Sequence, residues 1–223
     1  MIKYIKKLIN FFYYLFSQKI SSEKFIFSLK IDIDKIKYFL ELKNTLDRGD
    51  FIWDGDWDKK KIDISSYRNF SVSYNSIFQI YNENIDYEKC DEFIKKAKFL
   101  LEGKKTARAS NINELKNYFK SLDNLKDNLK KFGYKSQLEL KNNNKVNDEI
   151  GVVIDRDGKI IKLEDKFGGT HRFALCKVLK IKTIIVSVKA IHKSLLNEND
   201  LKEIENSNDE FFTKMILKEK IKS

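Results

Sequence analysis

The block formed by residues 150–188 constrains the fold more than any other part of this chain. Two apolar, β-branched runs in it are joined at Asp157 and Gly158, a pair that is typical of a β-hairpin turn. Two glycines, Gly168 and Gly169, come next, ahead of a helical stretch, and a further β-branched run follows that helix. The sequence therefore predicts the order strand, hairpin, strand, glycine loop, helix and strand.

The residues after the glycine pair are suited to binding an anion. Glycines let the backbone close around a phosphate, and the start of a helix offers unpaired N–H groups and a positive dipole end. Arg172 adds a fork of hydrogen-bond donors, and His171 stands beside it on the expected first turn. The alternative interpretation is a glycine turn that merely precedes an ordinary helix, and both interpretations stay open.

The rest of the chain predicts a discontinuous core. Apolar residues alternate over residues 25–33, which indicates a strand, and residues 34–40 have a helical pattern. Residues 86–101 and 113–132 carry apolar residues at spacings of three and four, which is typical of helices. We therefore expect an α+β protein whose small mixed sheet is completed by residues 25–60 and interrupted by a helical insertion.

Five segments follow from these patterns. At 223 residues the chain is long enough to bury a sizeable core. The expected segments are an N-terminal amphipathic helix at 1–24, a first part of the α/β core at 25–64, a helical insertion at 65–145, the remainder of the core with its glycine loop at 146–196, and a C-terminal helical tail at 197–223.

The N-terminal segment has a basic flank and an aromatic, apolar run. This run is about half the ~20 residues that a membrane-spanning helix needs. One interpretation is peripheral contact of residues 2–16 with the inner face of a membrane. The other is a helix packed against the domain.

Composition bears on partners and compartment. The net charge is +11, but the basic residues are mostly lysines spread along a chain that has no proline and abundant Lys, Ile, Asn and Phe. This pattern favours a solvated, lysine-rich surface over an anionic membrane or glycan surface, and favours specific nucleic-acid binding least. Cys90 and Cys176 lack metal-ligand spacing and suit a reducing cytosol, so we expect a cytoplasmic protein.

Acidic residues supply candidates for a general base or a metal site. Asp56 and Asp58 flank a tryptophan, and two carboxylates one residue apart can share Mg²⁺ or deprotonate a substrate hydroxyl. A surface turn is the alternative for this pair. Either Glu164 or Asp165, just before the glycines, could orient a nucleophile or a metal, and His192 either faces the site or lies on the surface.

Four motifs in fixed order carry a resemblance to a known family. Residues 167–172 (Phe-Gly-Gly-Thr-His-Arg) closely resemble the nucleotide-binding motif of sulfiredoxin, and residues 149–193 resemble the wider ParB/sulfiredoxin-like superfamily. Free-standing members of that superfamily include small-molecule kinases and glycan-cluster proteins. The latter combine a Gly-Asp-Trp-Asp motif, here residues 55–58, with an Asp-Gly turn, a Gly-x-His-Arg loop and a late histidine, here His192.

The resemblance implies a mixed sheet of ParB/sulfiredoxin type and a nucleotide, most naturally ATP, at the glycine loop. The implied nucleotide-binding residues are Gly168, Gly169, Thr170, His171 and Arg172, and the implied catalytic residues are Asp56, Asp58, Asp165 and His171. Thr170 stands where sulfiredoxin has its catalytic cysteine, so sulfiredoxin activity is not expected. Gly168 stands where family members commonly carry an aspartate, which leaves the identity of the base open.

These features together predict a nucleotide-dependent phosphotransferase acting, with Mg²⁺, on a small hydroxyl compound or a surface-glycan sugar in polysaccharide biosynthesis. Phosphoryl transfer needs mainly bound phosphates, neutralised charge and a positioned hydroxyl. The alternative is a ParB-like nucleotide-binding or DNA-binding module without an acceptor substrate. No helix-turn-helix pattern follows the glycine loop, as the DNA-partition branch would require.

Overall fold

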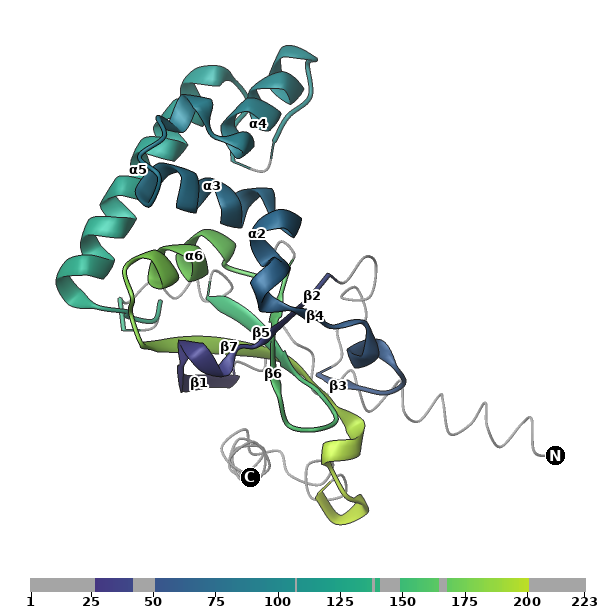
Figure 1. The fold of residues 1–223 in the computed structure, drawn as a ribbon. Coiled ribbons are helices and arrows are strands. Elements are labelled where there is room, and N and C mark those ends of the chain that lie inside the picture. The colour runs from purple at the N-terminus through teal and green to yellow at the C-terminus, as the bar shows by residue number, and fades with distance from the viewer. Residues whose placement is uncertain are drawn as a thin grey trace.

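The computed structural model describes residues 27–41, 51–106, 108–137, 139–140, 149–164 and 168–200. Within these ranges the chain is an α+β protein, as the sequence predicts, with helices covering one face of a mixed sheet (Figure 1). The expected helix at residues 1–24, the tail from residue 201 onward and the candidate residue Asp165 lie outside the described residues.

Seven strands in the described ranges form one sheet. They are β1 (Phe27–Asp32), β2 (Tyr38–Leu40), β3 (Ile52–Trp53), β4 (Ile62–Asp63), β5 (Ile150–Ile154), β6 (Ile160–Leu163) and β7 (Thr183–His192). The order is β1-β7-β5-β6-β2-β4, and β3 also pairs with β7. Strand β5 is parallel to β7 and antiparallel to β6, so the strands from residues 25–60 do complete the sheet that begins near residue 149.

The hairpin between β5 and β6 confirms the prediction made from the Asp-Gly pair. Gly158 has a φ of 77°, a backbone conformation that favours glycine. Its N–H donates to the carbonyl oxygen of Asp155, whose side chain accepts from the N–H groups of Asp157 and Lys159. Asp155 therefore accepts hydrogen bonds from three N–H groups of the turn, those of Asp157, Gly158 and Lys159.

The helix predicted over residues 34–40 is wrong. A short 3₁₀ turn at Ile33–Lys35 leads instead into strand β2, which pairs in parallel with β6. Phe39 and Leu40 are both buried but belong to clusters on opposite faces of the sheet. Alternating burial on two faces is the property of a strand, and tertiary pairing here overrides the local helical pattern.

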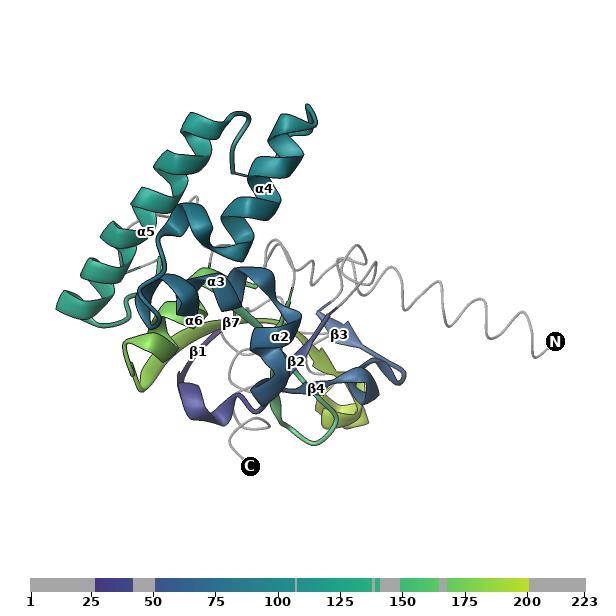
Figure 2. The ribbon, with the colours of Figure 1, turned by 45° about the horizontal axis from the view of Figure 1, so that its top comes forward.

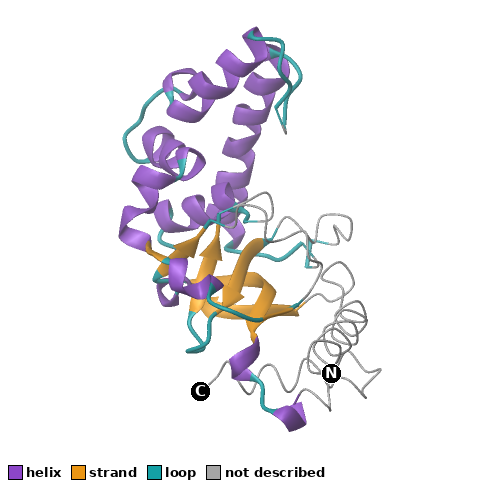
Figure 3. Cartoon of the chain, turned by 90° about the vertical axis from the view of Figure 1, so that its right-hand side faces the viewer, coloured by secondary structure: helices purple, strands orange, loops and turns teal. Residues whose placement is uncertain are grey.

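The predicted helices in the insertion and after the glycine loop are confirmed. The described helices are α2 (Tyr67–Phe70), α3 (Val72–Tyr81), α4 (Asp91–Leu101), α5 (Ile112–Phe132) and α6 (Thr170–Val178). Helix α6 lies between α3 and the sheet, whereas α4 and much of α5 extend away from the sheet beyond α3 (Figures 1 and 2). Figure 3 shows the same arrangement from the side, with the helical part above the sheet.

Helix α5 has clear signals at both ends. The Asn111 side chain accepts a hydrogen bond from the N–H of Glu114, and Gly133 ends the helix with a φ of 69°.

In the described ranges, no helix combines the length and the apolar character needed to cross a membrane.

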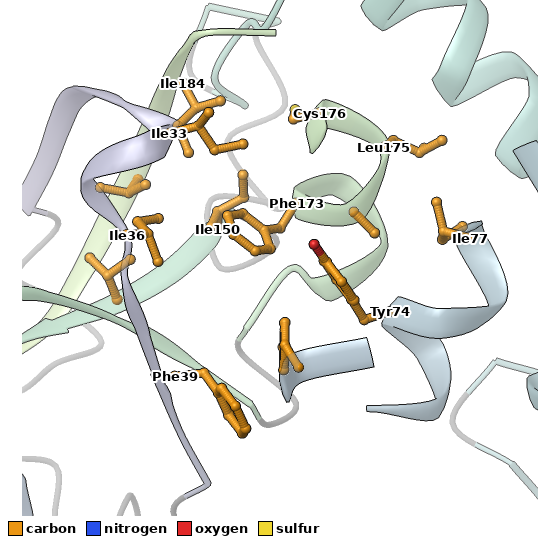
Figure 4. Packing of buried hydrophobic residues seen from close by; sticks show 14 of the residues in the cluster. Ile33, Ile36, Phe39, Tyr74, Ile77, Ile150, Phe173, Leu175, Cys176 and Ile184 are labelled. Atoms are coloured by element: carbon orange, nitrogen blue, oxygen red, sulfur yellow. The ribbon is translucent and has the colours of Figure 1, made fainter. Parts of the chain in front are cut away.

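The core fills the space between the sheet and its helices. Ile150 of β5 packs with Phe173 of α6 and Tyr74 of α3, whose rings are 5.8 Å apart (Figure 4). The opposite face of the sheet is also buried, by a second cluster centred on Leu40, Trp53, Val153, Ile161, Leu163 and Ala190. Strand β5 is therefore buried on both faces, and its two ends are where polar residues gather.

Candidate functional site

The start of α6 is fixed to the sheet by a glycine. Gly169 immediately precedes the helix with left-handed dihedral angles, a φ of 57° and a ψ of 37°. A Cβ atom at this position would lie 2.8 Å from the backbone oxygen of Glu149. The neighbouring Gly168 accepts a hydrogen bond of 3.3 Å from the N–H of Gly151 in β5. Position 169 therefore requires glycine for two reasons, its left-handed backbone conformation and its close contact with the backbone of Glu149.

Three consecutive side chains on the first turn of α6 each contact a glutamate from a different part of the chain. The pairs are Thr170 Oγ1 with Glu164 at 3.0 Å, His171 Nε2 with Glu92 at 2.6 Å, and Arg172 with Glu149 at 3.4 Å. The structure thus places these residues at a helix start, as the sequence predicts. It keeps the candidate Glu164 beside them and adds Glu92, which sequence reasoning did not connect to the loop.

Glu92 is the most enclosed of these carboxylates. It is 3% exposed, accepts from Ser73 Oγ at 2.8 Å and forms an ion pair with Lys96 at 2.6 Å. Burial would raise its pKa, but His171 and Lys96 outweigh this effect and lower the pKa to about 2. Glu92 is therefore ionised at neutral pH.

Three helix starts meet at this carboxylate. Ser73, Glu92 and His171 are each the second residue of their helix, α3, α4 and α6 respectively. A helix N-terminus carries roughly half a positive charge, which favours a nearby anion. The three helix starts together favour negative charge in this region, and the Glu92 carboxylate supplies one such charge.

Tyr118 completes a chain of hydrogen bonds through His171. Its hydroxyl lies 3.1 Å from Nδ1 of His171, on the opposite side of the imidazole from Glu92. The ring of Tyr118 also lies under two cations, with Lys96 Nζ 5.1 Å and Arg108 Cζ 5.8 Å from its centroid. The result is a continuous hydroxyl–imidazole–carboxylate arrangement contributed by α5, α6 and α4.

Glu164 forms a second polar group beside Thr170. It accepts hydrogen bonds from Ser71 Oγ at 2.6 Å and from the hydroxyl of Tyr67, in addition to Thr170. Ser71 caps α3, so this carboxylate lies at the starts of both α3 and α6. Burial and the Glu164 charge raise the pKa of Tyr67 well above its ordinary value, which keeps the phenol protonated.

Glu149 forms the third group, beside Arg172. It is buried and accepts from the hydroxyl of Tyr134 at 2.5 Å and from the N–H of Gln137. The guanidinium of Arg172 lies 6.0 Å from the centre of the Tyr134 ring. Arg172 is therefore held beside a buried carboxylate and an aromatic ring at the edge of the helix start.

The other sequence motifs gather elsewhere, around Arg156. Its guanidinium donates to both oxygens of Asp58, at 2.8 and 2.6 Å, and also to Asp56 at 2.8 Å. His192 Nε2 lies 2.8 Å from the carbonyl oxygen of Gly55, while its Nδ1 accepts from the N–H of Ser194. Hydrogen bonding with Arg156 lowers the pKa of Asp58 to about 2 against the opposing effect of burial.

The structure does not bring this Arg156 cluster together with the glycine loop. Gly168 lies beside Gly151 near the start of β5, whereas Asp58 accepts from the N–H of Arg156 just after the end of that strand. At about 3.3 Å per residue, the four steps from Gly151 to Asp155 correspond to roughly 13 Å. Asp56 and Asp58 therefore lie at the opposite end of β5 from His171.

A further expectation, that Cys176 has a packing role, can be compared with the structure. Cys176, on α6, is a buried free thiol whose pKa burial raises to about 12, which agrees with a packing role. Within the described ranges, no group of three or more His, Cys, Asp and Glu side chains is arranged to hold a metal ion.

The fold and the site define a mixed α+β protein in which a glycine positions the start of helix α6. The Thr-His-Arg sequence on the first turn of this helix contacts three glutamates. Comparisons of the chain with models of protein families, with curated proteins and with solved structures found no match.

Proposed function

We propose that this protein is a nucleotide-dependent phosphotransferase that binds nucleotide phosphates at the start of α6. The acceptor is a hydroxyl group of a small compound or of a surface-glycan sugar. The observation that carries the proposal is the convergence of three helix starts on His171, next to a glycine loop and Arg172. The resemblance of this loop to the ParB/sulfiredoxin-like nucleotide motif supports the same conclusion.

Two features of α6 support phosphate binding. Helices α3 and α5 have side-chain caps from Ser71 and Asn111, whereas the residue before α6 is Gly169, which has no side chain to cap it. A helix start without a side-chain cap from the preceding residue suits phosphate, because its N–H groups and dipole favour an anion. In addition, Arg172 brings a guanidinium to the first turn of α6, 3.4 Å from Glu149, and a guanidinium is suited to bidentate binding of phosphate.

The carboxylates near α6 suit the remaining requirements better than the Arg156 cluster does. Asp58 is bound on both oxygens by Arg156 and has a pKa of about 2, which makes it a weak base. We therefore assign the base to His171, oriented by Glu92, and a structural role to Asp56 and Asp58.

Mg²⁺ accompanies nucleotide phosphates and often needs only one or two protein carboxylates. Glu164 fits this requirement among the described residues. It lies directly beside Thr170 and accepts hydrogen bonds from neutral hydroxyl groups, which leaves its negative charge available. Mg²⁺ there would neutralise charge on the transferred phosphate.

Calorimetry with ATP, ADP and CTP tests the proposal. Replacing Arg172 with alanine should weaken nucleotide binding by roughly 10- to 100-fold, because a charge-assisted contact contributes about 1.5–3 kcal/mol. Arg68→Ala is the matched control, since the Arg68 guanidinium pairs with Glu83 and Asn75 rather than with a carboxylate beside α6. The control should bind nucleotide as the wild type does, and a wild type that binds no nucleotide would refute the proposal.

Transfer is tested with Mg²⁺, ATP labelled in its γ-phosphate, and pools of sugars, serine-like alcohols and lipid-linked glycans. Label should appear on an acceptor with the wild-type protein and be lost with Arg172→Ala. Nucleotide binding with tight DNA retention at physiological salt, and no transfer, would instead indicate a nucleotide-dependent binding module.

A further inference from the structure

The hydrogen bonds around His171 have the geometry of an activated nucleophile. The Tyr118 hydroxyl lies 3.1 Å from Nδ1, and the buried Glu92 carboxylate lies 2.6 Å from Nε2. A hydroxyl bonded to a base that is itself oriented by a third group is the structural signature of covalent catalysis. The three residues come from α5, α6 and α4, so tertiary packing alone brings them together.

The network assigns the proton on the imidazole. Glu92 is ionised and can only accept, so Nε2 of His171 carries the hydrogen of that bond. Nδ1 then presents its lone pair to the Tyr118 hydroxyl, which donates to it. With its hydrogen on Nε2, the neutral imidazole can accept a proton from Tyr118, and Glu92 is in place to stabilise the imidazolium that results.

Tyr118 differs from the other tyrosines in this part of the structure. The hydroxyls of Tyr67 and Tyr134 donate to Glu164 and Glu149, and Tyr87 donates to Glu88. A neighbouring carboxylate disfavours a phenolate because the two negative charges repel each other. Tyr118 instead faces an imidazole nitrogen, with Lys96 and Arg108 beside its ring. These cations offset the negative charge that develops on its oxygen.

We propose that Tyr118 is the nucleophile of this site and receives the phosphoryl group of a nucleoside triphosphate as a covalent tyrosyl phosphate. The inference rests on the proposed nucleotide binding at α6. The Tyr118 oxygen forms a bond to the γ-phosphorus, while the bond from that phosphorus to the β–γ bridging oxygen breaks. The phenolic proton moves to Nδ1 of His171, and the nucleoside diphosphate leaves with the bonding electron pair. The acceptor oxygen then forms a bond to the phosphorus while the bond from the phosphorus to the Tyr118 oxygen breaks. His171 returns its proton to the Tyr118 oxygen, and the proton of the acceptor hydroxyl passes to solvent.

The first experiment incubates the full chain with Mg²⁺ and ATP labelled in its γ-phosphate, without an acceptor. Peptide mass spectrometry should find one phosphoryl group on Tyr118. Tyr118→Phe should bind nucleotide as tightly as the wild type but lose labelling by about 100-fold or more. Tyr87→Phe is the matched control, because Tyr87 packs on Phe119 next to Tyr118 and its loss removes only a surface hydroxyl contact. This control should label normally.

The outcomes separate the two proposals. Equal labelling of Tyr118→Phe, or label on another residue, would overturn the role of Tyr118 while leaving nucleotide-dependent transfer intact. Absence of nucleotide binding by the wild type would refute the proposed function.

A second measurement does not depend on nucleotide. A tyrosine-selective sulfonyl electrophile should modify Tyr118 faster than the other tyrosines in the wild type, and this advantage should disappear in His171→Gln. A purely structural hydrogen bond would protect Tyr118 instead, so slow modification in the wild type would overturn the inference.

Discussion

Arg156 binds both carboxylate oxygens of Asp58, with hydrogen bonds of 2.8 and 2.6 Å, although the two residues are far apart in the sequence. Asp58 is only 2% exposed, whereas its partner reaches the surface. The pair connects the loop after β3 to the hairpin between β5 and β6. Together with the hydrogen bond from the Arg156 N–H to Asp58, it joins these two parts of the structure.

Replacing Arg156 with alanine should destabilise the fold, because the change leaves the Asp58 charge buried without its bidentate partner. Removing one partner of a buried charge leaves the other charge uncompensated, so the loss should exceed that from an exposed pair. Urea unfolding measures the loss. Lys59→Ala is the control, since Lys59 forms an exposed pair with Asp56 and exposed pairs contribute little to stability. Equal stability of the two variants would show that the Arg156 pair is not structural.

Stability should fall as the pH drops from about 4.5 to about 2. The folded-state pKa values of Asp58 and Glu92 are both about 2, below their ordinary values of 3.8 and 4.5. A lowered carboxyl pKa stabilises the folded state above the unfolded-state pKa, and this contribution is lost as the pH falls through the folded-state pKa. Urea unfolding at several pH values measures the number of protons that the protein takes up when it unfolds. In this window Glu92→Gln should take up about one proton fewer on unfolding than the wild type does.

Gly169→Ala should be far more damaging than Gly158→Ala. Both glycines have a positive φ, so alanine costs roughly 1–2 kcal/mol of backbone strain at either position. A Cβ at Gly158 has nothing within 4 Å, whereas one at Gly169 would lie 2.8 Å from the backbone of Glu149. Overpacking of this kind adds about 1–3 kcal/mol. Thermal unfolding compares the two, and nucleotide affinity should fall only in Gly169→Ala.

Membrane contact of residues 2–16 is a prediction from sequence alone. Full-length protein should float with anionic liposomes, and protein lacking this segment should remain at the bottom of the gradient, because its aromatic and lysine residues suit the interface. Identical behaviour of the two proteins would indicate that the segment does not contact membranes.

The sequence predicted the parts of the fold that local chemistry determines. The Asp157–Gly158 turn and the helix after Gly169 were identified because their signals lie within a few consecutive residues. Strand β2 was missed because its three residues are strand only through their pairing with β6. A pattern over residues 34–40 contains no information about that partner.

The candidate site could be predicted only in part, for the same reason. His171 and Arg172 were found from their place after two glycines. Glu92 and Tyr118 were not, because each is one polar residue on an ordinary amphipathic helix and only the packing of α4 and α5 against α6 brings them to His171. Asp56 and Asp58 are expected at the catalytic site because of the order of the motifs along the chain. That order does not indicate at which end of β5 each motif lies.

Strand β7 is the last described strand to be synthesised, yet it pairs with β1, β3 and β5. During synthesis on the ribosome, β1 and β3 therefore remain without their partner β7 until most of the chain has been made. The helical insertion is synthesised during this interval. Helices form from local contacts, whereas this sheet requires closure of a long loop. The nascent chain consequently carries helices α3 to α5 beside unpaired strands until residue 192 has left the exit tunnel, and unpaired strand edges are prone to aggregation.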